Sequence, residues 1–182
     1  MATTTANHLA RRIGADERTL RRAVALGLVH AERTSPRRLQ LGPGELRYLG
    51  ENWLLLRQLR SALRTEPNVR LAVLFGSTAR GDQGPGSDVD LLVQLRDEAV
   101  VRRRRLNSRL ERVVRRPVEL VPLNRASASL TTAALRDGRV LVDRDGEWPS
   151  LKRDEGKWLA AARREECRER EEARAALDEL LA

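Results

Sequence analysis

The most constraining feature of the sequence is an apolar run at residues 69–75 that ends in Gly76 and Ser77. Only Arg70 interrupts this run. A continuous apolar run of this length is typical of a strand that is buried on both faces, as in a sheet covered by helices. Glycine then lets the backbone turn sharply, so that a helix can begin at once. The stretch therefore predicts a buried strand that passes directly into a helix.

The second half of the chain, beyond Pro67-Asn68, alternates between strand and helix patterns. This alternation predicts an α/β (α+β) domain with a small mixed sheet flanked by helices. Beyond a turn at 143–146, residues 150–182 are expected to form one long helix, in which Glu166 and Arg170 have the spacing of an i,i+4 ion pair. The expected strands are 69–75, 89–95, 118–123 and 139–142, and the expected helices between them are 97–114 and 127–135.

The first part of the chain has the pattern of a winged helix-turn-helix. A helical pattern at 5–13 precedes Asp16, which can cap a second helix that ends before Gly27. Two short strand patterns around 34–36 then predict a hairpin. The usual first helix has almost no room at the N-terminus, and a long helix expected at 44–64 could supply it. The alternative is a small helical module that packs on the rest of the chain or on a partner.

Arginine dominates the charge of the chain, which has 35 Lys and Arg against 26 Asp and Glu and a net charge of +9. Arginine binds phosphates and carboxylates through a planar fork, which suits a nucleic acid, a nucleotide or an acidic partner. A bias in codon composition is the alternative explanation. In a helix-turn-helix, the residues placed to meet DNA phosphates and base edges are Arg18, Arg21, Arg22, Arg37 and Arg38.

A second group of arginines lies within residues 102–116 and makes the helix expected there strongly basic. This helix could guide RNA or an acidic protein, although a solvated face is the more common explanation for a run of charges. A single cysteine, Cys167, excludes an internal disulfide. The chain has no signal-peptide pattern and no apolar run of the roughly 20 residues that cross a bilayer. We therefore expect a cytoplasmic protein without membrane contact.

The chemistry of the chain centres on two short motifs. Glycine allows an anion to approach the backbone closely, and a helix N-terminus favours negative charge, so Gly76-Ser77 predicts a phosphate site. Asp88 and Asp90 are two residues apart on an expected strand and point to the same face. Adjacent carboxylates repel unless a cation lies between them, and hard oxygen ligands select Mg²⁺ or Mn²⁺. If the strand that carries Glu119 lies beside this one, a third carboxylate is roughly 4.8 Å away.

A phosphate site beside metal-binding carboxylates predicts phosphoryl or nucleotidyl transfer. The alternative is that Asp88 only caps a turn and that Glu119 is a surface residue on an edge strand. Arg80 follows the phosphate site and could contact a triphosphate, or it could be a solvated loop residue.

These motifs resemble the signature of the DNA polymerase β-like nucleotidyltransferase superfamily, in particular its minimal bacterial branch, which has Gly-Ser, a short loop and then Asp-x-Asp. The resemblance covers about residues 69–146. It implies that Gly76 and Ser77 bind a nucleoside triphosphate and that Asp88 and Asp90 hold Mg²⁺. It also implies a third acidic residue on a later strand, as metal ligand or base. Glu119 fits this position, where the family more often has Asp.

The resemblance implies a reaction that moves a nucleoside monophosphate, AMP if ATP is the donor, to a hydroxyl on a protein or RNA acceptor. Small members of the family often act as antitoxins that adenylylate a partner toxin, so a toxin is an expected partner. The alternative function is a DNA-binding transcriptional regulator whose nucleotidyltransferase fold senses nucleotide without turnover. The expected divisions are a winged helix-turn-helix at 1–44, a connecting helix at 45–66, the nucleotidyltransferase domain at 67–148 and a C-terminal helix at 149–182.

Overall fold

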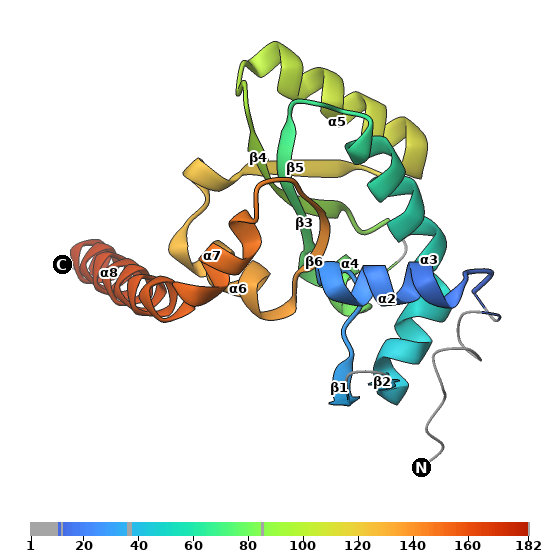
Figure 1. Ribbon diagram of the computed structural model, residues 1–182. Coiled ribbons are helices and arrows are strands. Elements are labelled where there is room, and N and C mark those ends of the chain that lie inside the picture. Colours follow the sequence, from blue (N-terminus) through green and yellow to red (C-terminus); the bar gives the residue numbers. More distant parts are fainter. Residues whose placement is uncertain (1–10, 12, 36–37, 85, 182) are drawn as a thin grey trace.

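A four-stranded mixed sheet forms the centre of the computed structural model, which describes residues 11, 13–35, 38–84 and 86–181 (Figure 1). The strand order is β5-β4-β3-β6. β3 lies antiparallel to both of its neighbours, whereas β4 and β5 are parallel. The expectation of a small mixed sheet flanked by helices is confirmed. The strands are β3 Val69–Phe75, β4 Val89–Leu95, β5 Val118–Pro122 and β6 Arg139–Asp143.

Strand β3 is buried on both faces, as its unbroken apolar run predicts. Ala72 and Leu74 belong to the larger hydrophobic cluster, which includes the helix α3 (Pro43–Arg64). Leu71 and Val73 point the other way, into a smaller cluster with the helix α6 (Ala128–Asp137). Because side chains alternate along a strand, one run supplies both layers of the core.

The N-terminal part contains the helix α2 (Glu17–Leu26), the hairpin strands β1 (Glu32–Ser35) and β2 (Arg38–Gln40), and then α3. The Asp16 carboxylate caps α2 by accepting a hydrogen bond from the Thr19 amide at 2.6 Å. Gly27 ends this helix in the left-handed conformation, with φ 85°. The second helix, the hairpin and the long helix are therefore confirmed, whereas the helix expected at 5–13 falls almost entirely outside the described residues.

The described residues of the N-terminal part share a hydrophobic core with the sheet. Leu20 of α2 and Leu49 of α3 belong to the same buried cluster as Val69 and Leu91 of the sheet. α2 also lies against β6, whose Val140 amide donates to the Gly27 carbonyl. These contacts are those of a module that packs on the sheet.

A buried arginine joins the N-terminal part to the sheet. Arg139 of β6 is only 3% exposed, and its guanidinium forms two hydrogen bonds, of 2.6 and 2.8 Å, with the Glu45 carboxylate of α3. Its Nε donates to the Ala79 carbonyl at 2.7 Å, and one Nη donates to the Leu28 carbonyl at 3.4 Å. The guanidinium also lies 3.5 Å from the centre of the Tyr48 ring. One side chain therefore ties together α3, β6, the loop after α2 and the short helix that follows β3.

The helix between β4 and β5 starts later than the sequence pattern suggests. This helix, α5, spans Val100–Val114, whereas the expected start is Asp97. The backbone of Asp97 is bound on both sides by the Asn68 amide group, and its carboxylate accepts from the Ala99 amide. Asp97 is thus held in a turn before the helix. At the other end of the connection, β5 stops at Pro122, because residues 123–125 form a 3₁₀ turn.

The C-terminal segment is two helices instead of the single helix expected at 150–182. α7 (Glu147–Arg153) starts early because the Asp143 carboxylate accepts from the first amides of this helix. α8 (Glu155–Leu181) follows after a break at Asp154 and packs on α6 (Figure 1). α7 contacts β6, whereas α8 contacts α6.

The long helix α8 contacts the rest of the protein near the middle of the helix, and it is charged beyond that point. Its Glu165 carboxylate accepts hydrogen bonds of 3.0 Å from the amides of Ala128 and Ser129 at the start of α6. The expected i,i+4 pair between Glu166 and Arg170 forms, with N and O 3.9 Å apart. None of the described helices combines the length and the apolar character needed to cross a membrane.

Candidate active site

The Gly76-Ser77 turn lies where β3 ends and the short helix α4 (Gly76–Arg80) begins, as predicted. Gly76 has φ +71°, a conformation that L side chains rarely adopt. A Cβ atom at this position would lie 2.3 Å from Oδ2 of Asp90. Glycine is therefore required for two reasons, the backbone angle and the close approach of the Asp90 carboxylate.

The sheet register brings two of the three predicted carboxylates together. Asp90 pairs with Phe75 across the β3–β4 ladder and with Glu119 across the parallel β4–β5 ladder. Asp90 is half-buried, whereas Glu119 is exposed on the edge strand. Asp88 is exposed and lies just before β4, one step outside the strand. The carboxylates therefore lie near one another, beside the Gly-Ser turn.

The neighbouring carboxylates affect the pKa of Asp90. Burial raises the pKa of the Asp90 carboxyl, and the negative charges of Glu119 and then Asp88 raise it further. A raised pKa shows that the ionised form is disfavoured, which a divalent cation would reverse. Carboxylate oxygens are the ligands that Mg²⁺ and Mn²⁺ prefer, so the donor set fits such an ion. Within the described ranges, however, no three His, Cys, Asp or Glu side chains converge as a metal-binding cluster.

The loop between α4 and β4 is fixed by polar contacts from two directions. Thr78 is fully buried, and its hydroxyl donates to the Asp88 carbonyl at 3.0 Å. Arg116 donates through Nε to the Ser87 carbonyl at 3.0 Å, and its Nη2 lies 3.3 Å from the Thr78 hydroxyl. Arg115 turns the chain after α5 with φ 55°, and Arg116 follows directly. These contacts hold Asp88 in place.

A cavity of about 420 Å³ lies at the carboxylates, between β5 and α5. Two arginines of α5, Arg103 and Arg104, line it together with Asp88 and Glu119. Arg104 is exposed and Arg103 is half-buried, which agrees with the solvated face expected for this helix. An anion that enters the cavity would meet guanidinium groups on one wall and carboxylates, or the cation they hold, on the other.

Arg80, the third residue predicted to bind nucleotide, is exposed at the end of α4. Its Nε pairs with the Asp82 carboxylate at 3.0 Å. Arg80 therefore has a local partner in the loop, and its contact with a triphosphate stays a prediction.

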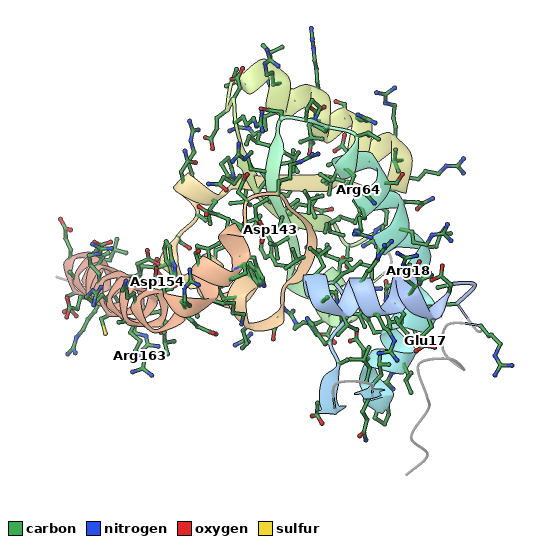
Figure 2. The ribbon with its side chains drawn as sticks, viewed as in Figure 1. Glu17, Arg18, Arg64, Asp143, Asp154 and Arg163 are labelled. Carbon is green, nitrogen blue, oxygen red and sulfur yellow. The ribbon has the colours of Figure 1, made fainter. Side chains whose placement is uncertain are left out.

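The arginines predicted to bind DNA lie far from the carboxylates in the chain. Arg18 and Arg22 are exposed on α2, where Figure 2 labels Arg18. Arg21 pairs with Glu17 one turn earlier, with N and O 2.5 Å apart. Arg38 begins β2, and Arg37 lies outside the described residues.

Comparisons with known proteins agree with this geometry. The family model described as "Polymerase beta, Nucleotidyltransferase" matches residues 57–147, which is half of the chain. A search of curated proteins gives no match.

Solved structures share the fold. A crystal structure described as a toxin-antitoxin with AMP-PNP contains a chain that is 25% identical, with a TM-score of 0.52; the match covers 70% of this chain and 98% of that one. A second structure contains a tri-AMPylated Shewanella oneidensis HEPN toxin in complex with an MNT antitoxin. Its matching chain is 22% identical, with a TM-score of 0.50, and the match covers 72% of this chain and 99% of that one.

The matched residues contain the whole sheet, the Gly-Ser turn and all three carboxylates. The similarity to the family thus covers the part of the chain that forms the candidate site. The chain belongs to the polymerase β nucleotidyltransferase family, and it is a nucleotidyltransferase.

Proposed function

We propose that this protein uses a divalent cation to transfer a nucleoside monophosphate, AMP from ATP, to a hydroxyl group of a partner protein. The observation that carries the proposal is the register of β4 and β5, which pairs Asp90 with Glu119 while Asp90 contacts the Gly76 backbone. This arrangement supports a cation site and a phosphate site about one strand spacing, roughly 4.8 Å, apart.

In the proposed mechanism, Gly76 and Ser77 hold the triphosphate at the start of α4. Asp88 and Asp90 would hold Mg²⁺ or Mn²⁺, with Glu119 as the third carboxylate. The bound cation would neutralise the triphosphate and ease deprotonation of the acceptor hydroxyl.

The acceptor oxygen forms a bond to the α-phosphorus, the bond from that phosphorus to the bridging oxygen breaks, and pyrophosphate leaves. Glu119 is exposed and lines the cavity, so it is placed to take the hydroxyl proton. Arg103 and Arg104 face the same space and would bind the departing phosphates.

A toxin is the proposed partner, and the protein would then be an antitoxin. The solved toxin–antitoxin structure at 25% identity supports this role, and its AMP-PNP, an analogue of ATP, supports ATP as the donor. RNA is the alternative acceptor, which the arginines of α5 favour.

The test is incubation with α-labelled ATP, Mg²⁺ and a lysate of the native host, followed by a search for label on protein or RNA. The double variant Asp88→Asn/Asp90→Asn should lose the transfer while the fold is retained. Asp82→Asn is the matched control, because Asp82 lies in the same loop but pairs with Arg80. Transfer that persists in the double variant would refute the proposed site. Label on RNA alone would refute the proposal that the acceptor is a protein.

We also propose that the N-terminal part is a winged helix-turn-helix that binds DNA. The order of α2, the hairpin and α3 supports this, as does the exposure of Arg18 and Arg22 on the face of α2 opposite Leu20. DNA affinity should fall steeply with salt and should weaken in Arg18→Ala/Arg22→Ala. No binding at low salt would refute this role. In the rival regulator hypothesis, the protein would bind triphosphate without releasing pyrophosphate.

A further inference from the structure

A second cavity lies between α2 and α3, apart from the catalytic carboxylates. Its volume is about 580 Å³, within the range of roughly 300–1,000 Å³ that is usual for small-ligand sites. None of the residues that line it belongs to the active site described above. They are Thr19 and Leu28 from the N-terminal part and Trp53, Leu54, Arg57, Gln58, Arg60, Ser61, Arg64 and Thr65 from α3 and its C-terminus.

Positive charge is concentrated on this cavity. Arg57, Arg60 and Arg64 follow one another at intervals of three and four residues, so they share one face of α3. None of the three forms an ion pair with any residue that the structure describes. Burial lowers the pKa of Arg60, and the neighbouring charges of Arg64 and of Arg22 on α2 lower it further. Like charges held together without a counter-charge are unfavourable.

Two hydrogen-bond donors of the lining are also without partners. The indole Nε1 of Trp53 and the Nε of Arg60 are buried, and neither has a hydrogen-bond partner among the described residues. The Trp53 side chain belongs to a residue that is only 6% exposed. Buried donors in proteins are nearly always satisfied, so two in one cavity indicate an acceptor outside the residues that the structure describes.

The rest of the lining combines two leucines with the polar side chains of Thr19, Gln58, Ser61 and Thr65. Leu28 is buried, and Leu54 is 65% exposed although it is a large hydrophobic residue. The cavity thus offers guanidinium groups and an indole N–H for an anionic group, and apolar surface for a flat or hydrocarbon part. Figure 2 labels Arg64 on α3 and Arg18 on α2, the helices on either side of this space.

We propose that the cavity between α2 and α3 is a second binding site, which takes the phosphate group of a nucleotide through Arg57, Arg60, Arg64 and the Trp53 indole. Planar guanidinium groups match phosphate oxygens in pairs, and the apolar surface of Leu28 and Leu54 would accommodate a nucleobase. The same phosphate chemistry is available from a free mononucleotide or from the backbone of a nucleic acid. The site is independent of the proposed transfer reaction, because none of its residues is catalytic.

The test is a calorimetric titration of the full chain with pyrophosphate and with AMP, in the absence of divalent metal. Arg57→Gln/Arg64→Gln removes two charges and should weaken binding about 100-fold. Trp53→Phe, which keeps a smaller aromatic ring but loses the N–H, should weaken it about tenfold. Arg47→Gln is the matched control, since Arg47 is an exposed arginine of the same helix outside the cavity. Arg103→Gln/Arg104→Gln identifies any binding at the catalytic cavity and should leave the α2–α3 site unchanged.

Two further arms distinguish the sources of the phosphate. Binding of AMP that is lost in Arg57→Gln/Arg64→Gln identifies a free nucleotide as the ligand. If only a 20-nucleotide strand binds, and the same variant loses it, the ligand is a nucleic-acid backbone. The proposal is overturned if pyrophosphate, AMP and the strand all bind this variant as tightly as the wild-type chain, or if none binds the wild-type chain.

Discussion

Replacement of Gly76 by alanine tests the central geometry of the site. The new Cβ would lie 2.3 Å from Oδ2 of Asp90, whereas ordinary van der Waals contact begins at 3.4 Å. The carboxylate must therefore move by about 1 Å, a displacement of the size that can lower a catalytic rate about 100-fold. The left-handed backbone angle of residue 76 adds a cost of about 1–2 kcal/mol in unfolding free energy.

Gly86→Ala is the matched control for this experiment. Gly86 lies in the loop between α4 and β4 with φ +85°, and a Cβ there would meet nothing within 4 Å. Both variants should lose about 1–2 kcal/mol of stability, measured by urea unfolding. Only Gly76→Ala should lose transfer of label from α-labelled ATP to the acceptor that the wild-type protein labels. Equal activity of the two variants would refute the idea that Asp90 must lie against the residue-76 backbone.

Two further predictions concern the contacts that join the parts of the fold. Arg139→Met should lower the unfolding free energy by about 3–5 kcal/mol, because it leaves the Glu45 carboxylate buried without its partner. Adding Glu45→Gln to this variant should restore part of the loss. An unchanged midpoint of urea unfolding in Arg139→Met would contradict this prediction. The pKa of Glu165 is lowered by the Ala128 and Ser129 amides, so its stabilising contact is present above the pKa of the unfolded chain and is lost as the pH falls through the lower folded pKa. Protection factors, which correct for the slower intrinsic exchange of amides in acid, should therefore fall at the start of α6 on acidification and in Glu165→Gln at neutral pH. An effect as large in the control Glu166→Gln would show that the contact is unimportant.

Local patterns in the sequence predict the parts of the site that depend on short stretches of chain. The run at 69–75 gives the buried strand, and glycine at 76 gives the turn. Alternation along β4 decides the face of the sheet to which Asp90 points, and Glu119 pairs with Asp90 across the β4–β5 ladder. These features follow from the period of a strand and from the steric freedom of glycine, which neighbours in space hardly change.

Contacts between distant residues escape this kind of reasoning. Arg139 and Glu45 are separated by 94 positions, and nothing near either residue in the sequence indicates the other. Arg116 reaches Ser87 across 29 positions for the same reason. The rotation of α5 against the sheet decides which two arginines of the run line the cavity. That rotation is set by packing of Leu106 and Leu110, and the spacing of these residues alone does not give the partner surface.

The limits of the N-terminal part illustrate the same point. Divisions at residues 44 and 66 follow changes in sequence pattern, but the hydrophobic cluster extends across both of them, from Leu20 through Leu49 to Val69. A boundary in pattern is thus not a boundary in packing, and the division into separate domains stays a prediction.

The position of Glu119 on an edge strand has a consequence for solubility. β5 is short and ends at Pro122, and its outer backbone groups could pair with a strand of another molecule. A charged side chain on such an edge opposes that pairing, as edge charges do in many sheet proteins. A residue retained for its chemistry would therefore also keep the protein monodisperse. Glu119→Gln preserves a polar edge, whereas Glu119→Val would expose an apolar strand that can aggregate, so a loss of activity in the valine variant would report self-association as much as catalysis.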